Sequence, residues 1–490
     1  MDVARSKQNQ VIVLVAVGAA AVLLSIQLLI PPVIGLADNG DFEKVMGYAG
    51  FQYSTDKYED KYWSHIVTKF VIVRPGWWRS GYLTSETLLA SVARLATEAV
   101  SGGNIFDIRV LGGLHMFLLL VAIGLIVSSC RDLAAATQWL VAFLLVFVFT
   151  DVGYAAKFNS FYSETASLLF LLLTVSVAAL AIQRGRLAGG LLLVYFLCAV
   201  LFVGSKPQES IQGPLLAVFA LRLASARLKA WWRQPAIWMA LGLCAFSFWY
   251  YRSTPVTAIR NPNLFDNMFM ELLPNSPDPR RDLDELGLAP DLLKYSGTHA
   301  YMANSPVRDP AFQTAFFDRF GYRALLRFYL SHPARLFDRI RRGAHQAFRL
   351  RPNLGNFERA AEPANTGMSR HFACWSELRL PLNRHGLLWI TLLLGGNLGA
   401  IAASYRRSSG TARLFREGVA LVVLIASTEF VVCALAAFLM DIARHLYIFQ
   451  ALFDLILLAD VAWLVETLWR RRRAGSLATV QAEVATISRP

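Results

Sequence analysis

Long apolar runs alternate with shorter polar segments through most of the chain. About ten of these runs approach the ~20 residues that a helix needs to cross the hydrocarbon core of a bilayer. They cover residues 11-30, 109-129, 137-153, 163-183, 187-203, 208-223, 235-252, 386-404, 417-439 and 445-466. The pattern therefore predicts an all-α polytopic membrane protein with about ten transmembrane helices.

Two polar stretches are too long to be simple connections between spans. Residues 31-108 follow the first apolar run, and residues 253-385 precede the last three. In the first loop, apolar residues recur at helical spacing from Thr84 to Val100, which predicts an amphipathic helix that lies on the membrane or packs on the spans. The second loop is too large to be structureless and is expected to fold as a helical cap.

The second half of this cap loop has its own amphipathic pattern. Phenylalanines and leucines alternate with arginines between Pro310 and Arg351, which predicts a pair of helices on an anionic surface. Four arginines in this region either grip a lipid phosphate or contact headgroups without specificity, and they are Arg335, Arg339, Arg341 and Arg342.

These boundaries divide the chain into four parts. The predicted parts are an N-terminal transmembrane module (1-252) that includes the loop 31-108, an extracytoplasmic cap loop (253-385), C-terminal transmembrane helices (386-473) and a cytoplasmic tail (474-490).

The composition agrees with a membrane protein. The chain has 490 residues, of which 55% are hydrophobic, so it is too apolar for an ordinary soluble enzyme. Its formal net charge is +14, but many Lys and Arg residues lie in short connections between spans, where membrane insertion favours them. The charge is therefore attributed to topology, and no nucleic-acid partner is expected.

The same basic residues predict an orientation. With Arg5 and Lys7 in the cytoplasm, the short basic loops at 130-138, 184-186, 222-234 and 405-416 all fall on the cytoplasmic side. Both chain termini are then cytoplasmic. The two long loops and the other tight turns face outward.

Two predicted outer turns carry carboxylates. Asp38 and Asp41 flank an Asn-Gly pair, a turn-forming signal, so both side chains can face one small volume. The segment 157-164 begins with Lys157 and ends with Glu164, near the start of a predicted helix. Each has a simple structural explanation, since Asp38-Asp41 could be a solvated helix end and Glu164 could complement a helix dipole.

Two further outer turns carry mainly basic residues. The segment 204-209 contains Lys206, which could pair with a phosphate or with Glu209, and the segment 441-445 contains Arg444 and His445. Charges near the hydrocarbon are usually paired or functional. Because all four charged turns fall on one side, we expect a shared polar site beneath the cap.

Three of these motifs carry a resemblance to a known family. The segments 35-42, 157-164 and 444-446 are similar to bacterial S-layer-type glycan-biosynthesis hexosyltransferases of the GT-C superfamily of polytopic glycosyltransferases. The resemblance implies a GT-C-like fold in the bacterial cytoplasmic (inner) membrane, with the active site facing the extracytoplasmic side. It also implies an acidic catalytic residue in the first outer loop and a polyprenyl-phosphate sugar donor.

The expected activity is hexose transfer from such a donor to a glycan or lipid-linked acceptor. Such a reaction needs a carboxylate that takes the proton of the acceptor hydroxyl and cations that stabilise the leaving phosphate. Asp38 is the expected base, Asp41 orients the acceptor or holds a cation, and Glu164 is a further acidic residue. The residues expected to meet the donor phosphate or lipid are Lys157, Lys206, Arg444 and His445.

Several alternatives stay open at this point. A divalent cation (Mg²⁺ or Mn²⁺) could bind Asp38 and Asp41, either aspartate could be the base, and the sugar, the acceptor and the oligomeric state are not predicted. The competing function is a transporter, flippase or polymerase of lipid-linked glycans. A transporter predicts polar residues at mid-membrane depth and an internal repeat.

Overall fold

The computed structural model describes residues 2–75, 83–184, 189–227, 229–254, 259–359, 367–437 and 442–487, with side chains for residues 5–473 of these. The protein is predominantly helical, as predicted. Within the described residues, six helical segments are long and apolar enough to cross a membrane. They are α1 (Asp2–Leu28), α5 (Ile108–Ser129), α8 (Ser163–Gln183), the run Cys374–Tyr405 with α17 (Cys374–Arg379), α18 (Gly386–Ile390) and α19 (Gly396–Tyr405), α20 (Gly410–Ala436) and α22 (Tyr447–Ile487).

The count rises to seven if one bent pair of helices forms a single span. Helix α6 (Ala135–Phe149) and the segment Val152–Asn159, which contains α7 (Val152–Ala155) and η1 (Ala156–Asn159), meet at an angle of 53°. Three other predicted spans form α9 (Gly189–Val203), α10 (Gly213–Arg227) and α11 (Arg233–Ser253), which are not among the six.

The structure thus supports six or seven spans, and ten are not confirmed. Helices α9 and α10 have 15 residues each. At 1.5 Å per residue they are about 22 Å long, which is less than the ~30 Å hydrocarbon core.

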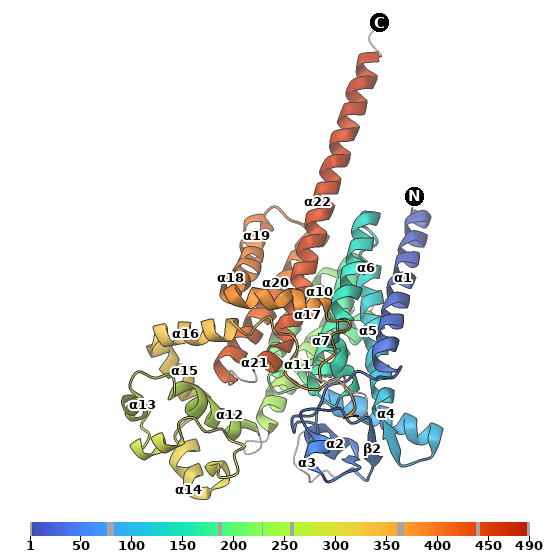
Figure 1. Ribbon diagram of the computed structural model, residues 1–490. Helices are drawn as coiled ribbons and strands as arrows, with labels where there is room; N and C mark the ends of the chain where they lie inside the picture. Colours follow the sequence, from blue (N-terminus) through green and yellow to red (C-terminus); the bar gives the residue numbers. More distant parts are fainter. Residues whose placement is uncertain are drawn as a thin grey trace.

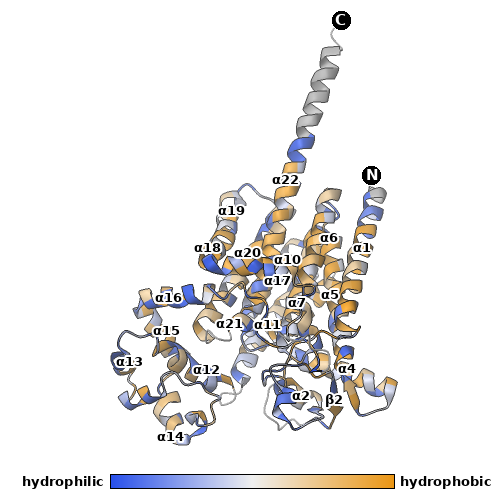
Figure 2. Cartoon of the chain, in the orientation of Figure 1, coloured by the Kyte–Doolittle hydropathy of each residue, from blue (hydrophilic) through white to orange (hydrophobic). Residues whose placement is uncertain are grey.

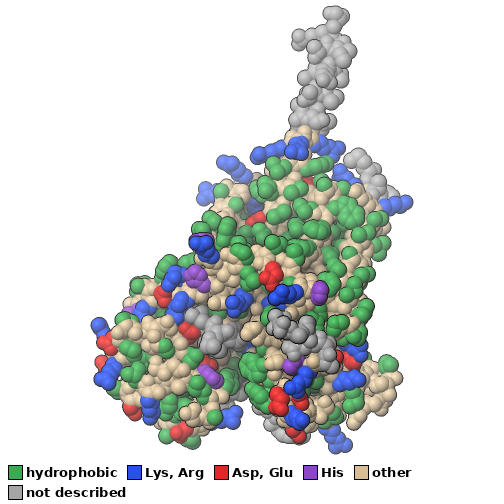
Figure 3. Space-filling view, viewed as in Figure 1, with side chains coloured by type: hydrophobic (Ala, Val, Ile, Leu, Met, Phe, Trp, Pro, Cys, Tyr) green, Lys and Arg blue, Asp and Glu red, His purple; other side chains and the backbone are tan. Residues whose placement is uncertain are grey.

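The two ends of the helix bundle differ in structure. The N-terminus and the long helix α22 lie at one end, whereas the elements of both long loops gather at the other, here called the loop end (Figure 1). Apolar residues dominate the bundle helices in Figure 2, and hydrophobic side chains cover much of the bundle surface in Figure 3. This distribution is typical of a membrane-spanning body.

The first loop folds onto the loop end. It contains α2 (Glu43–Ala49), β1 (Phe51–Tyr53), α3 (Tyr58–Lys61), β2 (Lys69–Ile72), α4 (Ser85–Ser101) and β3 (Ile105–Asp107). The three short strands form an antiparallel sheet in the order β1-β2-β3, with Tyr53 opposite Phe70 and Phe70 opposite Phe106. The sequence analysis did not predict this sheet, because its strands have only three or four residues each.

Helix α4 is the amphipathic helix predicted over Thr84 to Val100. The Thr84 hydroxyl caps it by accepting from the backbone N–H of Thr87. Leu89 is buried where α4 packs against α2, α5 and α8, while Leu88 and Leu95 on the other side are exposed.

The cap loop has a hydrophobic core of its own. Its main helices are α12 (Asn261–Asp266), the π-helix η5 (Asn267–Leu272), α13 (Pro279–Glu285), α14 (Pro310–Phe312), the π-helix η8 (Gln313–Phe317), α15 (Tyr322–Ser331) and α16 (Pro333–Ala344). Phe265, Phe269, Phe312 and Phe316 lie at the centre of this core. The predicted helix pair between Pro310 and Arg351 corresponds to α15 and α16.

After the cap, the chain returns to the first loop. The backbone N–H of Gly35 donates to the carbonyl of Asn356 (3.0 Å), and that of Ala37 donates to the carbonyl of Gly355 (2.9 Å). Gly355 has no room for a side chain, since an ideal Cβ would lie 1.8 Å from the Ser64 carbonyl oxygen. Both long loops therefore brace the Asp38–Asp41 turn from outside the bundle.

The remaining helices are short and complete the chain between these elements. They are η2 (Glu209–Gln212), η3 (Ala230–Trp232), η6 (Pro290–Tyr295), η7 (Pro306–Arg308), α17 (Cys374–Arg379), η10 (Leu380–His385), α18 (Gly386–Ile390), η11 (Thr391–Gly395), α19 (Gly396–Tyr405) and α21 (Ile442–His445).

Candidate functional site

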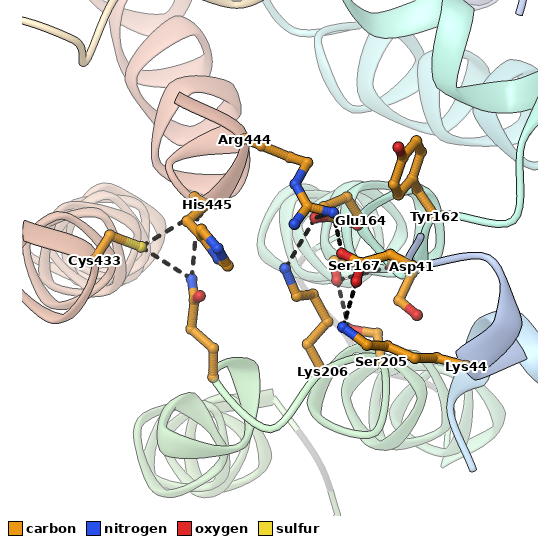
Figure 4. A network of polar contacts seen from close by, with 12 residues as sticks. Asp41, Lys44, Tyr162, Glu164, Ser167, Ser205, Lys206, Cys433, Arg444 and His445 are labelled. Carbon is orange, nitrogen blue, oxygen red and sulfur yellow. Dashed lines mark hydrogen bonds and ion pairs between the residues drawn. The ribbon is translucent and has the colours of Figure 1, made fainter. Parts of the chain in front are cut away.

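An ion-pair network occupies the loop end of the bundle. It consists of Asp41, Lys44, Glu164, Lys206 and Arg444, and is here called the Asp41 network (Figure 4). These side chains come from four separate segments: the turn before α2 with α2 itself, the start of α8, the α9–η2 turn, and α21. The predicted convergence of Asp41, Glu164, Lys206 and Arg444 is thus present.

Asp41 lies between two cations. Its Oδ1 accepts a hydrogen bond from Lys44 Nζ, and its Oδ2 accepts one from Arg444 Nη1. The Asp41 side chain is 25% exposed. Burial raises the pKa of Asp41, but Arg444 and Lys44 outweigh this effect and hold the pKa well below its usual range. Asp41 is therefore ionised at neutral pH and remains partly accessible.

Glu164 and Lys206 form the second half of the network. Lys206 Nζ donates to Glu164 Oε1 at 3.1 Å, and Arg444 Nη1 lies 3.9 Å from the same oxygen. Glu164 stands in the first turn of α8, where a carboxylate also complements the positive end of the helix dipole. Arg444 thus links the two carboxylates, so that a ligand that binds Arg444 would act on both.

Asp38, three residues before Asp41, is 1% exposed. Its Oδ1 accepts from the backbone N–H groups of Gly40 (2.8 Å) and Phe42 (3.1 Å), and its Oδ2 accepts from the Tyr53 hydroxyl (2.6 Å). Gly40 has a φ of +101°, a left-handed conformation that favours glycine. The Asp38 carboxylate therefore holds the turn in shape.

The two aspartates differ in charge state as well as in exposure. Burial raises the pKa of Asp38 to about 6, although the hydrogen bonds from Tyr53, Phe42 and Gly40 lower it in part. Burial also raises the pKa of the Tyr53 hydroxyl, and the neighbouring Asp38 raises it further, so this hydroxyl stays a donor.

Lys157 and His445 lie beside the network. Lys157 is 1% exposed, and its Nζ lies 4.2 Å from the centre of the Tyr447 ring, a cation–π contact. It lies close enough to act electrostatically on Glu164. The backbone carbonyl of His445 accepts from Gln208 Nε2 (3.5 Å) and from Cys433 Sγ (3.2 Å). Asp441, the first residue of the segment 441-445, lies outside the described residues.

Asn159, inside the segment 157-164, has a structural role. Its Nδ2 donates to the carbonyls of Leu28 (2.9 Å) and Ile34 (2.8 Å), which ties the end of α1 to the turn. Tyr162 donates to the Ala37 carbonyl (2.8 Å), and its ring lies 5.4 Å from the Arg444 guanidinium. These contacts fix the Asp38–Asp41 turn against the start of α8.

A buried clamp, which the sequence analysis missed, positions the start of α8. Glu86 of α4 accepts from the backbone N–H of Ala166 (3.1 Å), and its other oxygen lies 3.0 Å from His115 Nε2 of α5. His115 Nδ1 in turn lies 2.9 Å from the Phe158 carbonyl. Glu86 thus satisfies a backbone donor in the first turn of the helix that carries Glu164.

Lys44 was also missed, although its spacing offered a signal. It lies three residues after Asp41 in the first turn of α2, and side chains three apart are neighbours on a helix. Glu429 of α20 had no local signal. It accepts from Gln208 (2.5 Å) and Gln212 (2.7 Å), which connects α20 to the segment after Lys206.

The carboxylates do not assemble a divalent-cation site in this arrangement. Asp41 already contacts Lys44 and Arg444, and the Asp38 oxygens are taken by protein donors. Among the described residues, no group of three or more His, Cys, Asp or Glu side chains is placed to hold a metal ion.

The chemistry available at the site follows from its charges. Within the five residues of the Asp41 network, three cations face two carboxylates, so cationic groups are concentrated where an anion could bind. Guanidinium and ammonium groups are the usual partners of phosphate oxygens. A carboxylate that is partly exposed beside them can accept a proton.

Comparisons with known proteins support the membrane assignment. The family model described as the YfdI N-terminal transmembrane domain matches residues 2–482, which is nearly the whole chain. No curated protein matched, and no solved structure matched. The match and the apolar helices agree that several helices span a membrane. The chain therefore belongs to the YfdI N-terminal transmembrane domain family and is a multi-pass integral membrane protein.

Proposed function

We propose that this protein is a membrane glycosyltransferase of the GT-C type, which transfers a hexose from a polyprenyl-phosphate donor to a glycan or lipid-linked acceptor. The observation that carries the proposal is the convergence of Asp41 and Glu164 with Arg444 and Lys206 at one end of a bundle of membrane-spanning helices. The donor phosphate would reach this site from the bilayer while its polyprenyl chain stays between helices. The loop end would then face the extracytoplasmic side of the bacterial inner membrane.

We assign the base to Asp41 and not to Asp38. Asp38 is 1% exposed and its oxygens are occupied by donors of the turn, whereas Asp41 is partly exposed beside the cations. In the proposed step, the acceptor oxygen bonds to the anomeric carbon, the bond from that carbon to the phosphate oxygen breaks, and Asp41 takes the hydroxyl proton. Polyprenyl phosphate leaves with the electron pair.

Donor binding would activate Asp41. A phosphate that binds Arg444 and Lys206 competes with Asp41 and Glu164 for the same cations. Once Arg444 turns to the phosphate, its positive charge no longer lowers the pKa of Asp41 as strongly, while burial still raises that pKa. The pKa of Asp41 therefore rises, and the carboxylate becomes a better base. The network would thus couple donor binding to proton abstraction.

The departing phosphate would need stabilisation by positive charge. Arg444 and Lys206 are preorganised beside Glu164, and Lys157 lies near them. Preorganised charges in a partly desolvated site stabilise a developing anion more strongly than water-exposed charges do. His445 is placed next to this group by the bonds to its carbonyl.

The direct test is transfer by the purified protein in proteoliposomes. A panel of polyprenyl-phosphate hexoses is offered with candidate acceptors, and the release of polyprenyl phosphate is measured. We expect release with at least one donor, and release slower by roughly 10²- to 10⁴-fold with the Asp41→Asn variant. Asp56→Asn is the matched control, because Asp56 is a fully exposed carboxylate in the same loop. If the wild-type protein and Asp41→Asn give equal release, the proposal is wrong.

The second candidate function is transport of a lipid-linked glycan. It is favoured by one observation, since Asp460 in α22 accepts from Asn397 (2.7 Å) within the spanning region. The same proteoliposomes distinguish the two functions. A transporter moves the labelled lipid between leaflets and leaves it chemically intact, whereas the transferase cleaves it.

A further inference from the structure

Helix α15 presents one mixed basic and apolar side to the outside. Arg323, Leu326, Arg327 and Leu330 are all exposed and follow the spacing i, i+3, i+4, i+7, so they share one face. Leu326 is 48% and Leu330 63% exposed. The opposite face, with Leu325 and Phe328, is buried in the core of the cap. The exposed leucines are thus not required for the packing of the cap.

Helix α16 lies across the ends of the spans next to it (Figure 1). Its Gly343 is so close to α20 that an ideal Cβ would lie 3.2 Å from the Cβ of Ala434. Gly386, at the start of α18, is packed more tightly still, since an ideal Cβ would lie 2.0 Å from the carbonyl oxygen of Ala344. A helix that runs crosswise at the end of spanning helices lies close to the plane of the membrane surface.

The exposed apolar surface continues from the span onto α16. Phe337 of α16 is 59% exposed, and α16 contacts α18. On α18 and η11, Leu388, Trp389 and Leu392 are 54%, 41% and 56% exposed. Tryptophan is enriched where spans meet the lipid headgroups. Phe337 is thus an exposed aromatic side chain on a helix that contacts a span with exposed apolar residues.

The charges on this surface are not those suggested by the sequence. The four arginines of α16 pair with carboxylates of the chain: Arg335 with Asp282 (2.7 Å), Arg339 and Arg342 with Glu271 (2.6 and 3.3 Å), and Arg341 with Asp338 (2.7 Å). In the described part of the chain, Arg323 and Arg327 of α15 form no ion pair. They are the arginines available to an anion outside the protein.

We propose that α15 and α16 dock the cap onto the surface of a bilayer that contains anionic lipids. Leu326, Leu330 and Phe337 enter the boundary between headgroups and acyl chains, and Arg323 and Arg327 contact the lipid phosphates. Such a combination of apolar and basic residues binds the interface through buried apolar area and electrostatic attraction. The proposal does not depend on the transferase activity.

Collision accessibility of spin labels in nanodiscs tests this proposal. A cysteine for labelling is introduced by Leu330→Cys and, as a second variant, Phe337→Cys, in a background where all five native cysteines are replaced by serine or alanine. The matched control is Thr314→Cys, an exposed polar position on the same cap. Helical content by circular dichroism shows that each variant is folded.

Oxygen concentrates in lipid, whereas a nickel chelate stays in water. We expect the ratio of oxygen accessibility to nickel accessibility to be severalfold higher at positions 330 and 337 than at position 314. Replacing anionic by neutral lipids should reduce this ratio, and the double variant R323Q/R327Q should remove the difference between the two lipid mixtures. Nickel accessibility at 330 and 337 equal to that at 314 would overturn the proposal. Protection from both reagents would overturn it too, since a protein surface would then cover this face.

Discussion

The two ends of the Asp38–Asp41 turn carry the same side chain in opposite environments. Asp38 is buried among uncharged donors, and its pKa is raised to about 6. Asp41, three residues later, meets two cations, and its pKa is lowered. Burial acts on both carboxylates in the same direction, so the difference comes from the neighbouring charges.

This difference gives the two aspartates of the turn different roles, one structural and one chemical. Asp38 has satisfied oxygens and little access to a ligand, which suits a residue that holds the turn. Asp41 shares Arg444 with Glu164, and Arg444 can turn from these carboxylates to a bound anion. Variants at the two positions should therefore have different effects: Asp41 variants on transfer, and Asp38 variants on the pH dependence of stability.

The largest expected effect is that of Asp41→Asn on transfer. Loss of a general base typically lowers the rate by roughly 10²- to 10⁴-fold. Because Asp41 is 25% exposed, we expect the variant to fold. The rate of polyprenyl phosphate release is measured alongside the midpoint of thermal unfolding. A decrease in both quantities together would assign Asp41 to the fold as well and would break the contrast with Asp38.

Arg444→Ala should have the next largest effect, on donor binding. Arg444 contacts both carboxylates of the network and is the proposed ligand of the donor phosphate. A lost charge-assisted hydrogen bond costs about 1.5–3 kcal/mol, which corresponds to a roughly 10- to 100-fold weaker affinity. Arg444→Lys keeps the charge but not the planar fork, so its affinity should fall between the two. Equal affinity of Arg444→Ala and wild type for polyprenyl phosphate would remove Arg444 from the donor site.

Asp38→Asn should change the pH dependence of stability much more than it changes transfer. A carboxyl group whose pKa rises on folding destabilises the fold increasingly as pH rises from its unfolded value of 3.8 to its folded value of about 6. Over that interval the wild type should lose roughly 3 kcal/mol that the variant does not lose. The asparagine oxygen can still accept from Gly40 and Phe42, and its amide can donate to Tyr53.

Thermal unfolding of both proteins between pH 4 and pH 7 provides the measurement. The difference in midpoint between variant and wild type should grow up to about pH 6 and then stay constant, as the pKa of Asp38 requires. A constant difference over the whole range would mean that Asp38 titrates normally. The pKa of Asp38 would then not be raised, and the contrast with the lowered pKa of Asp41 would be smaller than proposed.

The sequence predicted which turns meet, but not the role of each residue. Arg444 and Asp41 are 403 positions apart, and only the alternation of spans places them at the same end of the bundle. That alternation was visible in the apolar runs, of which the described residues support six or seven as spans.

The burial of Asp38 could not be predicted in the same way. It depends on Tyr53 at the end of β1 and on the backbone of residues 355–356, which reaches the turn from a distant loop. The strand β1 has three residues, too few to give a clear alternating pattern. Which aspartate is buried was therefore decided by tertiary contacts, and the sequence alone left the two equivalent.

Tyr53→Phe should have the smallest effect, and it tests the difference between Asp38 and Asp41 most directly. It removes one donor from Asp38 Oδ2 and leaves the backbone donors at Oδ1 in place. We expect unfolding to become easier by about 1.5–3 kcal/mol at neutral pH, where Asp38 is ionised and the lost bond is charge-assisted. Transfer should stay within about twofold of wild type, as expected for a residue that touches only Asp38 among the acidic groups of the turn.

Because the Tyr53 hydroxyl lowers the pKa of Asp38, its loss should also move the pH-dependent change in stability to higher pH. A large loss of transfer with unchanged stability would show instead that the Tyr53–Asp38 pair acts in the reaction, and the assignment of the base to Asp41 would then be wrong.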